Sequence, residues 1–160
     1  MRNGEQELST MTKPRIAFGV LVVLLGASAA GAQDARGAGR VKVSSGAAFV
    51  VREGRAIPAT PGQVVLEADV LRTGADGRLG ITLNDDTRVS LGPASEVRVD
   101  RFAYASSDGG LRLVLKFVRG VSAYVSGRIA KLSPDAVRLE TPAAIVGVRG
   151  TTLAIRVDEQ

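Results

Sequence analysis

Short runs of alternating apolar and polar residues restrict most strongly how this chain can fold. Apolar residues occupy every second position in residues 79–83, 97–99, 111–117 and 153–157. Because side chains of a strand point alternately to opposite faces, this pattern predicts strands with one buried face and one face in water. Between residues 41 and 157, no segment of helical length repeats its apolar residues with a 3.6-residue period.

Clusters of Gly, Asp, Asn, Ser and Pro separate these runs, at residues 74–77, 84–86, 92–95 and 106–110. Closely spaced turn signals of this kind are typical of sandwiches, barrels and solenoids built from short strands. The chain contains no exact internal repeat, so a solenoid would have to be short and irregular. The sequence therefore predicts an all-β fold, either a short irregular β-solenoid or a β-sandwich or roll of short antiparallel strands.

The first 40 residues differ in composition from the rest. Basic residues precede the apolar run 16–25, and small residues follow it as far as Ala32. This order is typical of a secretory signal peptide, so we expect residues 1–32 to be removed after Ala32. The apolar run is shorter than the roughly 20 residues that a membrane-spanning helix needs, which makes an uncleaved anchor the alternative. We expect residues 33–40 to form a disordered leader and residues 41–160 to form one β domain.

The absence of Cys and His excludes several kinds of chemistry. A chain without them has no disulfide, no thiol nucleophile, no Ser-His-Asp triad and no ordinary zinc site. The net charge of +5 is spread over single basic residues, and the chain has two Tyr, four Phe and no Trp. Nucleic-acid binding needs a basic patch, usually with stacking aromatic residues, so it is not expected. We predict a non-enzymatic protein with no metal, cofactor or small-molecule substrate.

Two pairs of polar residues could form a metal or catalytic site, or could be ordinary turn and surface residues. Asp85 and Asp86 are adjacent carboxylates, and calcium binding is the alternative to a plain β-turn. No further ladder of oxygen ligands accompanies them, which favours the turn. Ser126 and Lys131 could form a Ser–Lys pair, but nothing in the sequence brings them together. An exposed polar pair is the favoured interpretation.

Arg149 is the one charged residue in the segment 141–155. A buried guanidinium is tolerated only when it is paired and hydrogen-bonded. We interpret Arg149 as a buried structural tie, with Asp69, Asp85 or Asp86 as its carboxylate partner. A partner-binding arginine and a simply exposed arginine are the alternatives.

Four segments, in this order, resemble the FecR-type periplasmic domain: 67–74, 83–95, 120–127 and 141–151. The last segment, TPAAIVGVRGT, is the most specific. Its motif residues are Thr141, Pro142, Gly147, Arg149, Gly150 and Thr151, and the earlier ones are Asp69, Asp85, Asp86 and Thr87. The resemblance implies a β-rich, non-enzymatic domain in the periplasm of a Gram-negative cell envelope.

The chain departs from the pattern of the named regulators in two ways. Few and mostly polar residues precede the apolar run, so we expect a stand-alone exported form that lacks their anti-sigma region. The usual Asp-Gly-Ser/Thr turn of the family is Asp85-Asp86-Thr87 here. Asp adopts the left-handed conformation less readily than Gly, so we expect mild strain at Asp86.

Two functions remain open at this level. The first is a binding, scaffolding or signal-sensing module that contacts an unidentified envelope protein through a sheet edge or a loop rim. The second is a peptidoglycan- or carbohydrate-binding module, with Tyr104 and Tyr124 as the sugar platforms. We expect the first, and we expect membrane contact only if the signal segment stays uncleaved.

Overall fold

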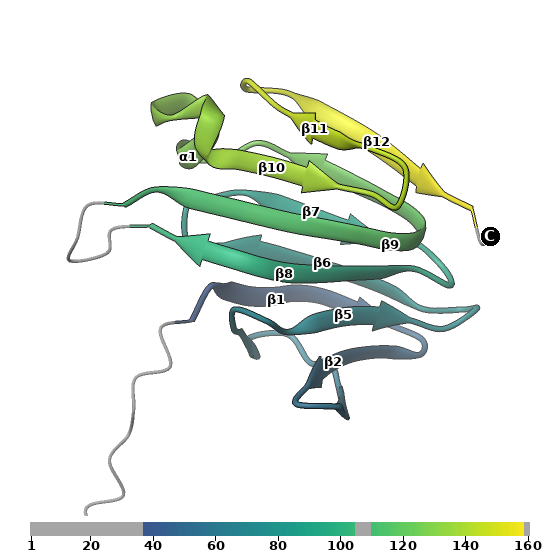
Figure 1. Cartoon of the computed structure of the whole chain (residues 1–160). Coiled ribbons are helices and arrows are strands. Elements are labelled where there is room, and N and C mark those ends of the chain that lie inside the picture. The colour runs from purple at the N-terminus through teal and green to yellow at the C-terminus, as the bar shows by residue number, and fades with distance from the viewer. Residues whose placement is uncertain (1–36, 105–109, 159–160) are drawn as a thin grey trace, which may run out of the picture. The chain divides into compact units, whose positions relative to one another are not determined.

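Strands dominate the computed structural model, which describes residues 37–104 and 110–158 (Figure 1). The elements are β1 (Gly39–Ser45), β2 (Ala48–Arg52), β3 (Arg55–Pro58), β4 (Val64–Val65), β5 (Val70–Thr73), β6 (Arg78–Leu83), β7 (Arg88–Leu91), β8 (Glu96–Ala103), β9 (Arg112–Val125), α1 (Arg128–Leu132), the short 3-10 helix η1 (Pro134–Ala136), β10 (Val137–Glu140), β11 (Ile145–Gly147) and β12 (Thr152–Val157). The all-β prediction is confirmed.

The predicted signal peptide, residues 1–32, lies outside the described residues. The described part of the chain belongs to one unit, residues 32–160. Its first strand begins at Gly39, inside the segment 33–40 for which we expected a disordered leader, and Ala38 is already buried in the core. None of the helices among the described residues has the length and hydropathy of a membrane span.

The strands form one curled, twelve-stranded sheet that is best described as two halves sharing β9. Sheet A contains β4, β1, β6, β7, the second part of β9 and β12. Sheet B contains β3, β2, β5, β8, the first part of β9, β10 and β11. Neighbouring strands are antiparallel, except that β10 runs parallel to β9. In Figure 1, β6 and β7 lie behind β8 and β9.

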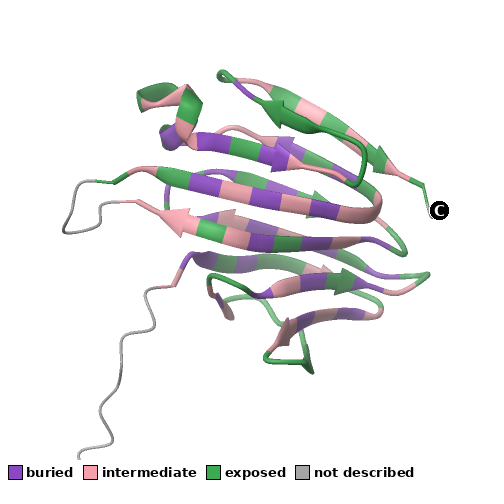
Figure 2. Ribbon diagram, in the orientation of Figure 1, coloured by how far each residue is buried: buried purple, intermediate pink, exposed green. Residues whose placement is uncertain are grey.

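Apolar side chains from both sheets form a single buried cluster. Buried and exposed residues alternate along the strands, as Figure 2 shows, and this is the alternation that the sequence predicts. The largest fully buried side chains include Phe117, Leu71, Leu79 and Tyr124. The apolar residues of β12 pack against the edge of the cluster and are partly buried.

Gly120 is the point at which β9 passes from sheet B to sheet A. Its φ is +84, and a Cβ there would lie 2.6 Å from Ser95 Cα and 2.7 Å from the Ala94 carbonyl oxygen. Only glycine fits this conformation and this space. The bend also changes which face is buried: Phe117 points into the core before it, and Ser122 and Tyr124 are buried after it.

Candidate functional site

The turn Asp85-Asp86-Thr87 is held inside the domain by the Asp85 carboxylate. Its oxygens accept hydrogen bonds from the Thr87 backbone N (3.1 Å), the Thr87 hydroxyl (2.8 Å) and the Ile129 backbone N (3.3 Å). Asp85 is completely buried, so these donors replace the water that a carboxylate would otherwise bind. The contact to Ile129 joins the β6–β7 turn to the start of α1. Asp85 is therefore a structural tie, and it accepts its hydrogen bonds from residues other than Arg149.

Asp86 is the residue of this turn with a left-handed backbone conformation. Its φ is +68, which confirms that Asp occupies the left-handed position that Gly fills in the usual pattern. Its carboxylate is exposed and forms an ion pair with Arg128 (2.9 Å). Beside the turn, Gly127 passes so close that a Cβ would lie 2.6 Å from Thr87 Oγ1.

Tyr124 is completely buried next to the same turn. Its hydroxyl has no hydrogen bond of normal geometry within the described part of the chain. Burial raises the pKa of Tyr124, the charge of Asp85 adds to the rise, and the nearby hydroxyls of Ser126 and Thr87 oppose it. The proposed use of Tyr124 as a sugar platform is wrong, because a fully buried ring offers no face to a ligand.

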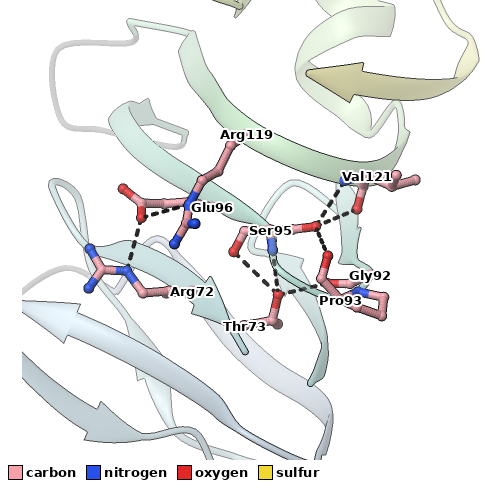
Figure 3. A network of polar contacts seen from close by, with 8 residues as sticks. All are labelled: Arg72, Thr73, Gly92, Pro93, Ser95, Glu96, Arg119 and Val121. Carbon is pink, nitrogen blue, oxygen red and sulfur yellow. Dashed lines mark hydrogen bonds and ion pairs between the residues drawn. The ribbon is translucent and has the colours of Figure 1, made fainter. Parts of the chain in front are cut away.

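A second polar network holds the bend of β9 (Figure 3). Thr73 Oγ1 accepts a hydrogen bond from the Ser95 backbone N (2.9 Å) and donates to the Gly92 carbonyl (2.6 Å). Ser95 Oγ accepts from the Val121 backbone N (2.9 Å) and lies 3.0 Å from the carbonyl oxygens of Val121 and Pro93. The network thus ties the ends of β5 and β7 to β9 directly after Gly120.

Asp69, the third predicted motif carboxylate, forms a bidentate ion pair with Arg52. Arg52 Nη2 lies 2.7 Å from Asp69 Oδ2, and Arg52 Nε lies 2.9 Å from Oδ1. The hydrogen bond to Asp69 raises the pKa of Arg52, although partial burial opposes the rise. Asp69 also accepts from the Leu66 backbone N (2.7 Å), and Arg52 donates to the Val64 carbonyl (2.9 Å). The arginine–carboxylate tie expected at Arg149 is therefore formed by Arg52 and Asp69.

Arg149 itself is exposed, so its interpretation as a buried tie is wrong. No ion pair within residues 37–104 and 110–158 involves it. Of its motif, Thr141 caps the tight β10–β11 connection by accepting a hydrogen bond from the Ala144 backbone N (3.0 Å), and Gly150 supplies a φ of +61. Thr151 donates its backbone N to Ser126 Oγ (3.0 Å). Pro142 and Gly147 are exposed.

The motif segment forms the exposed edge of sheet B. Among the described strands, β11 pairs only with β10, and its three residues are all exposed. Ile145 is 68% exposed and Val146 is 40% exposed. A groove of about 670 Å³ runs beside this edge, lined by Pro134, Asp135, Val137, Arg138, Ile145, Gly147, Val148 and Arg149. We call β11 and this groove the β11 edge. It combines an open strand, two exposed aliphatic side chains and two guanidinium groups, which are features that can dock an extended peptide segment.

The remaining candidates lie apart from the β11 edge. Tyr104 is half-buried, and its hydroxyl lies 3.5 Å from Arg128 Nη1. Ser126 and Lys131 line one depression, but no hydrogen bond joins them in the part of the chain that the structure describes. Residues 37–104 and 110–158 contain no group of three or more acidic residues that could hold a metal ion.

Several structurally important residues were missed by the sequence interpretation. Arg52, Thr73 and Ser95 carry no local signal, since each is an ordinary polar residue whose partner lies far away in the sequence. Gly120 does carry a signal, because a glycine within an otherwise strand-like pattern indicates a bulge or a close backbone approach.

A family model described as "FecR protein" matches residues 69–160, which include Asp69, the turn at Asp85, the bend at Gly120 and the β11 edge. No curated protein and no solved structure matches the chain.

Proposed function

The chain belongs to the FecR protein family, and we propose that it is a non-enzymatic module of the bacterial envelope that binds an envelope protein through the β11 edge. The family suggests a signal-sensing or regulatory role, which supports a protein partner in general terms. The observation that carries the proposal is the exposure of β11: the family match extends over it, and yet its side chains do not pack into the core.

The chemistry of the edge supports a peptide partner. The backbone of β11 has no strand on its outer side among the described strands, so an extended segment could add there by backbone hydrogen bonds. Ile145 and Val146 offer apolar contacts, while Arg138 and Arg149 in the groove suit carboxylates of the partner. The location we propose is the periplasm, with residues 1–32 acting as a cleaved signal peptide; sequencing the N-terminus of the exported protein tests this.

A pull-down from envelope extract tests the binding site. We expect the full chain to retain an envelope protein, and Ile145→Asp to lose it, because the substitution puts a charge on the apolar part of the edge. The matched control is Ile57→Asp, on the edge strand β3 of the same sheet, where Ile57 is 39% exposed. Melting temperatures close to that of the parent show that both variants are folded.

The result that contradicts this site is equal retention by Ile145→Asp and Ile57→Asp. Sedimentation with peptidoglycan forms a parallel arm of the experiment. Retention on peptidoglycan with no co-purifying protein would contradict the protein-binding proposal and support the carbohydrate alternative. In that case Tyr104→Ala is the informative variant, since Tyr104 is the partly exposed tyrosine of the pair considered.

A further inference from the structure

The outer face of sheet A carries basic side chains without acidic neighbours on its strands. The basic residues are Arg40 and Lys42 on β1, Arg78 on β6, Arg88 on β7 and Arg156 on β12, and all five are exposed. The strand residues of sheet A include no Asp or Glu. None of the ion pairs of the described residues involves any of the five. We call these residues basic face A.

The strand register brings these cations together. Arg40 lies opposite Thr82, and Thr82 lies opposite Arg88, so the two arginines are two strands apart on one face. At about 4.8 Å per strand, their backbones are about 10 Å apart. Lys42 is the extra residue where the register shifts between Val41 and Val43, and it is exposed beside them. The sheet thus concentrates charges that are scattered singly along the sequence.

The centre of basic face A consists of four small residues and the exposed Val43. One row across the strands consists of Val43, Gly80, Ser90, Ala123 and Ala154. Protein interfaces are usually anchored by buried aromatic or arginine side chains that enter pockets, and this row offers no aromatic side chain. A surface that offers cations and no aromatic anchor suits an array of negative groups better than a shaped protein or a stacked sugar.

A polar depression adjoins the face at Arg88. It has a volume of about 570 Å³ and is lined by Thr82, Asp86, Arg88, Ser126, Gly127, Arg128 and Lys131. Asp86 is paired with Arg128, whereas Arg88 and Lys131 take part in no ion pair within the described residues. An arginine and a lysine that are not neutralised are suitable donors for a phosphate group.

We propose that basic face A docks the domain on an anionic lipid surface, with a lipid phosphate entering the depression between Arg88 and Lys131. This surface is separate from the β11 edge, so the proposal goes beyond binding of a protein partner. Each basic residue close to an anionic membrane contributes about 1 kcal/mol to the free energy of binding. Salt weakens this attraction, which at 0.1 M ionic strength extends over about 10 Å. Sheet B is less suitable, because ion pairs occupy many of its arginines, such as Arg72 with Glu96 and Arg101 with Glu67.

Co-sedimentation of the full chain with vesicles tests the proposal. The vesicles contain either phosphatidylcholine alone or phosphatidylcholine mixed with phosphatidylglycerol. We expect stronger binding to the anionic vesicles, and a loss of binding as salt is raised. The double variant Lys42→Gln/Arg88→Gln should bind about 25-fold more weakly, since 1 kcal/mol per residue corresponds to about fivefold. Lys131→Gln should weaken binding about fivefold.

The matched control is Arg112→Gln/Lys116→Gln, which removes two charges from β9 in sheet B and should weaken binding much less. Both double variants keep residues 1–36, so any contribution of the N-terminal apolar run cancels in their ratio. An equal loss of vesicle binding in the two double variants would overturn the assignment of lipid binding to basic face A. Equal binding to neutral and anionic vesicles would overturn the electrostatic basis.

Poly-glutamate serves as the probe for an acidic protein partner. Binding of poly-glutamate through Lys42 and Arg88, with no binding to anionic vesicles, would overturn the lipid surface as the occupant. Ile145→Asp should leave vesicle binding unchanged, which separates a failure of this proposal from a failure of the β11 edge.

Discussion

The family match covers two regions that use polar residues in opposite ways. In residues 69–95, Asp69, Thr73, Asp85, Thr87 and Ser95 are all at most 2% exposed. In residues 141–151, Val148 is the one buried residue, and Arg149 lies in an open groove. In the first region, each buried carboxylate or hydroxyl has hydrogen-bond partners and the residues hold the fold. In the second, the exposed side chains of Ile145, Val146 and Arg149 are accessible to another molecule. A family motif therefore does not by itself tell a structural residue from a binding residue.

The largest expected effect comes from removing the carboxylate of the first region. Asp85→Ala leaves the Thr87 hydroxyl and two buried backbone N–H groups without their acceptor, and should lower the free energy of unfolding by about 3 kcal/mol or more. Urea denaturation measures this change. Asp135→Ala, at an exposed position of η1, is the control and should change little. A stability of Asp85→Ala equal to that of the parent would show that the first region does not depend on its buried carboxylate.

Gly120→Ala should destabilise the domain nearly as much, lowering the free energy of unfolding by about 3 kcal/mol. The added methyl group would lie 2.6 Å from Ser95 Cα on a residue whose φ is +84, so the bend of β9 has to shift. Gly147→Ala is the matched change in the second region, where no heavy atom beyond the glycine and its two chain neighbours lies within 4 Å of the added Cβ. Thermal or urea unfolding compares the two. Similar decreases in the stability of both variants would contradict the difference in packing between the two regions.

The two arginines give the most direct comparison. Arg52→Ala removes a bidentate pair with the buried Asp69 and should lower stability by about 2 kcal/mol. Arg149→Ala removes an exposed side chain and should change stability by no more than about 0.5 kcal/mol. Both values come from the same denaturation experiment. A loss for Arg149→Ala as large as that for Arg52→Ala would restore Arg149 as a structural tie.

The smallest expected effect is a gain. Asp86→Gly should raise stability by about 0.5 kcal/mol, because Gly adopts the φ of +68 without the strain that a side chain imposes. The exposed ion pair with Arg128 is lost as well, and such pairs contribute little. Asp86→Asn removes the charge without relieving the backbone, so it separates the two contributions. A melting temperature of Asp86→Gly below that of Asp86→Asn would contradict strain at this turn.

Local patterns were sufficient for the strands and for one turn. The alternation in residues 79–83 and 113–117 places the same residues inside that the structure buries, because period two is a property of the extended backbone itself. The left-handed conformation of Asp86 agrees with the expectation from the family resemblance, in which Gly usually occupies this position of the turn. Residues 121–125 show where local alternation fails to predict burial. Their sequence favours burial of Val121 and Ala123, whereas the structure buries Ser122 and Tyr124, because the bend at Gly120 shifts the alternation by one residue.

The sequence by itself determined the all-β class, the spacing of its turns and the family, since each depends on the identity and order of residues along the chain and not on which strands pair. Only the tertiary structure decided which arginine is the tie, because Arg52 and Asp69 meet across two segments, and Asp85 meets Ile129 at a separation of 44 residues. It also decided that five scattered cations share one face of sheet A. The physical reason is the same in each case: burial and charge density depend on which strands become neighbours, and strand pairing joins residues that are distant in sequence.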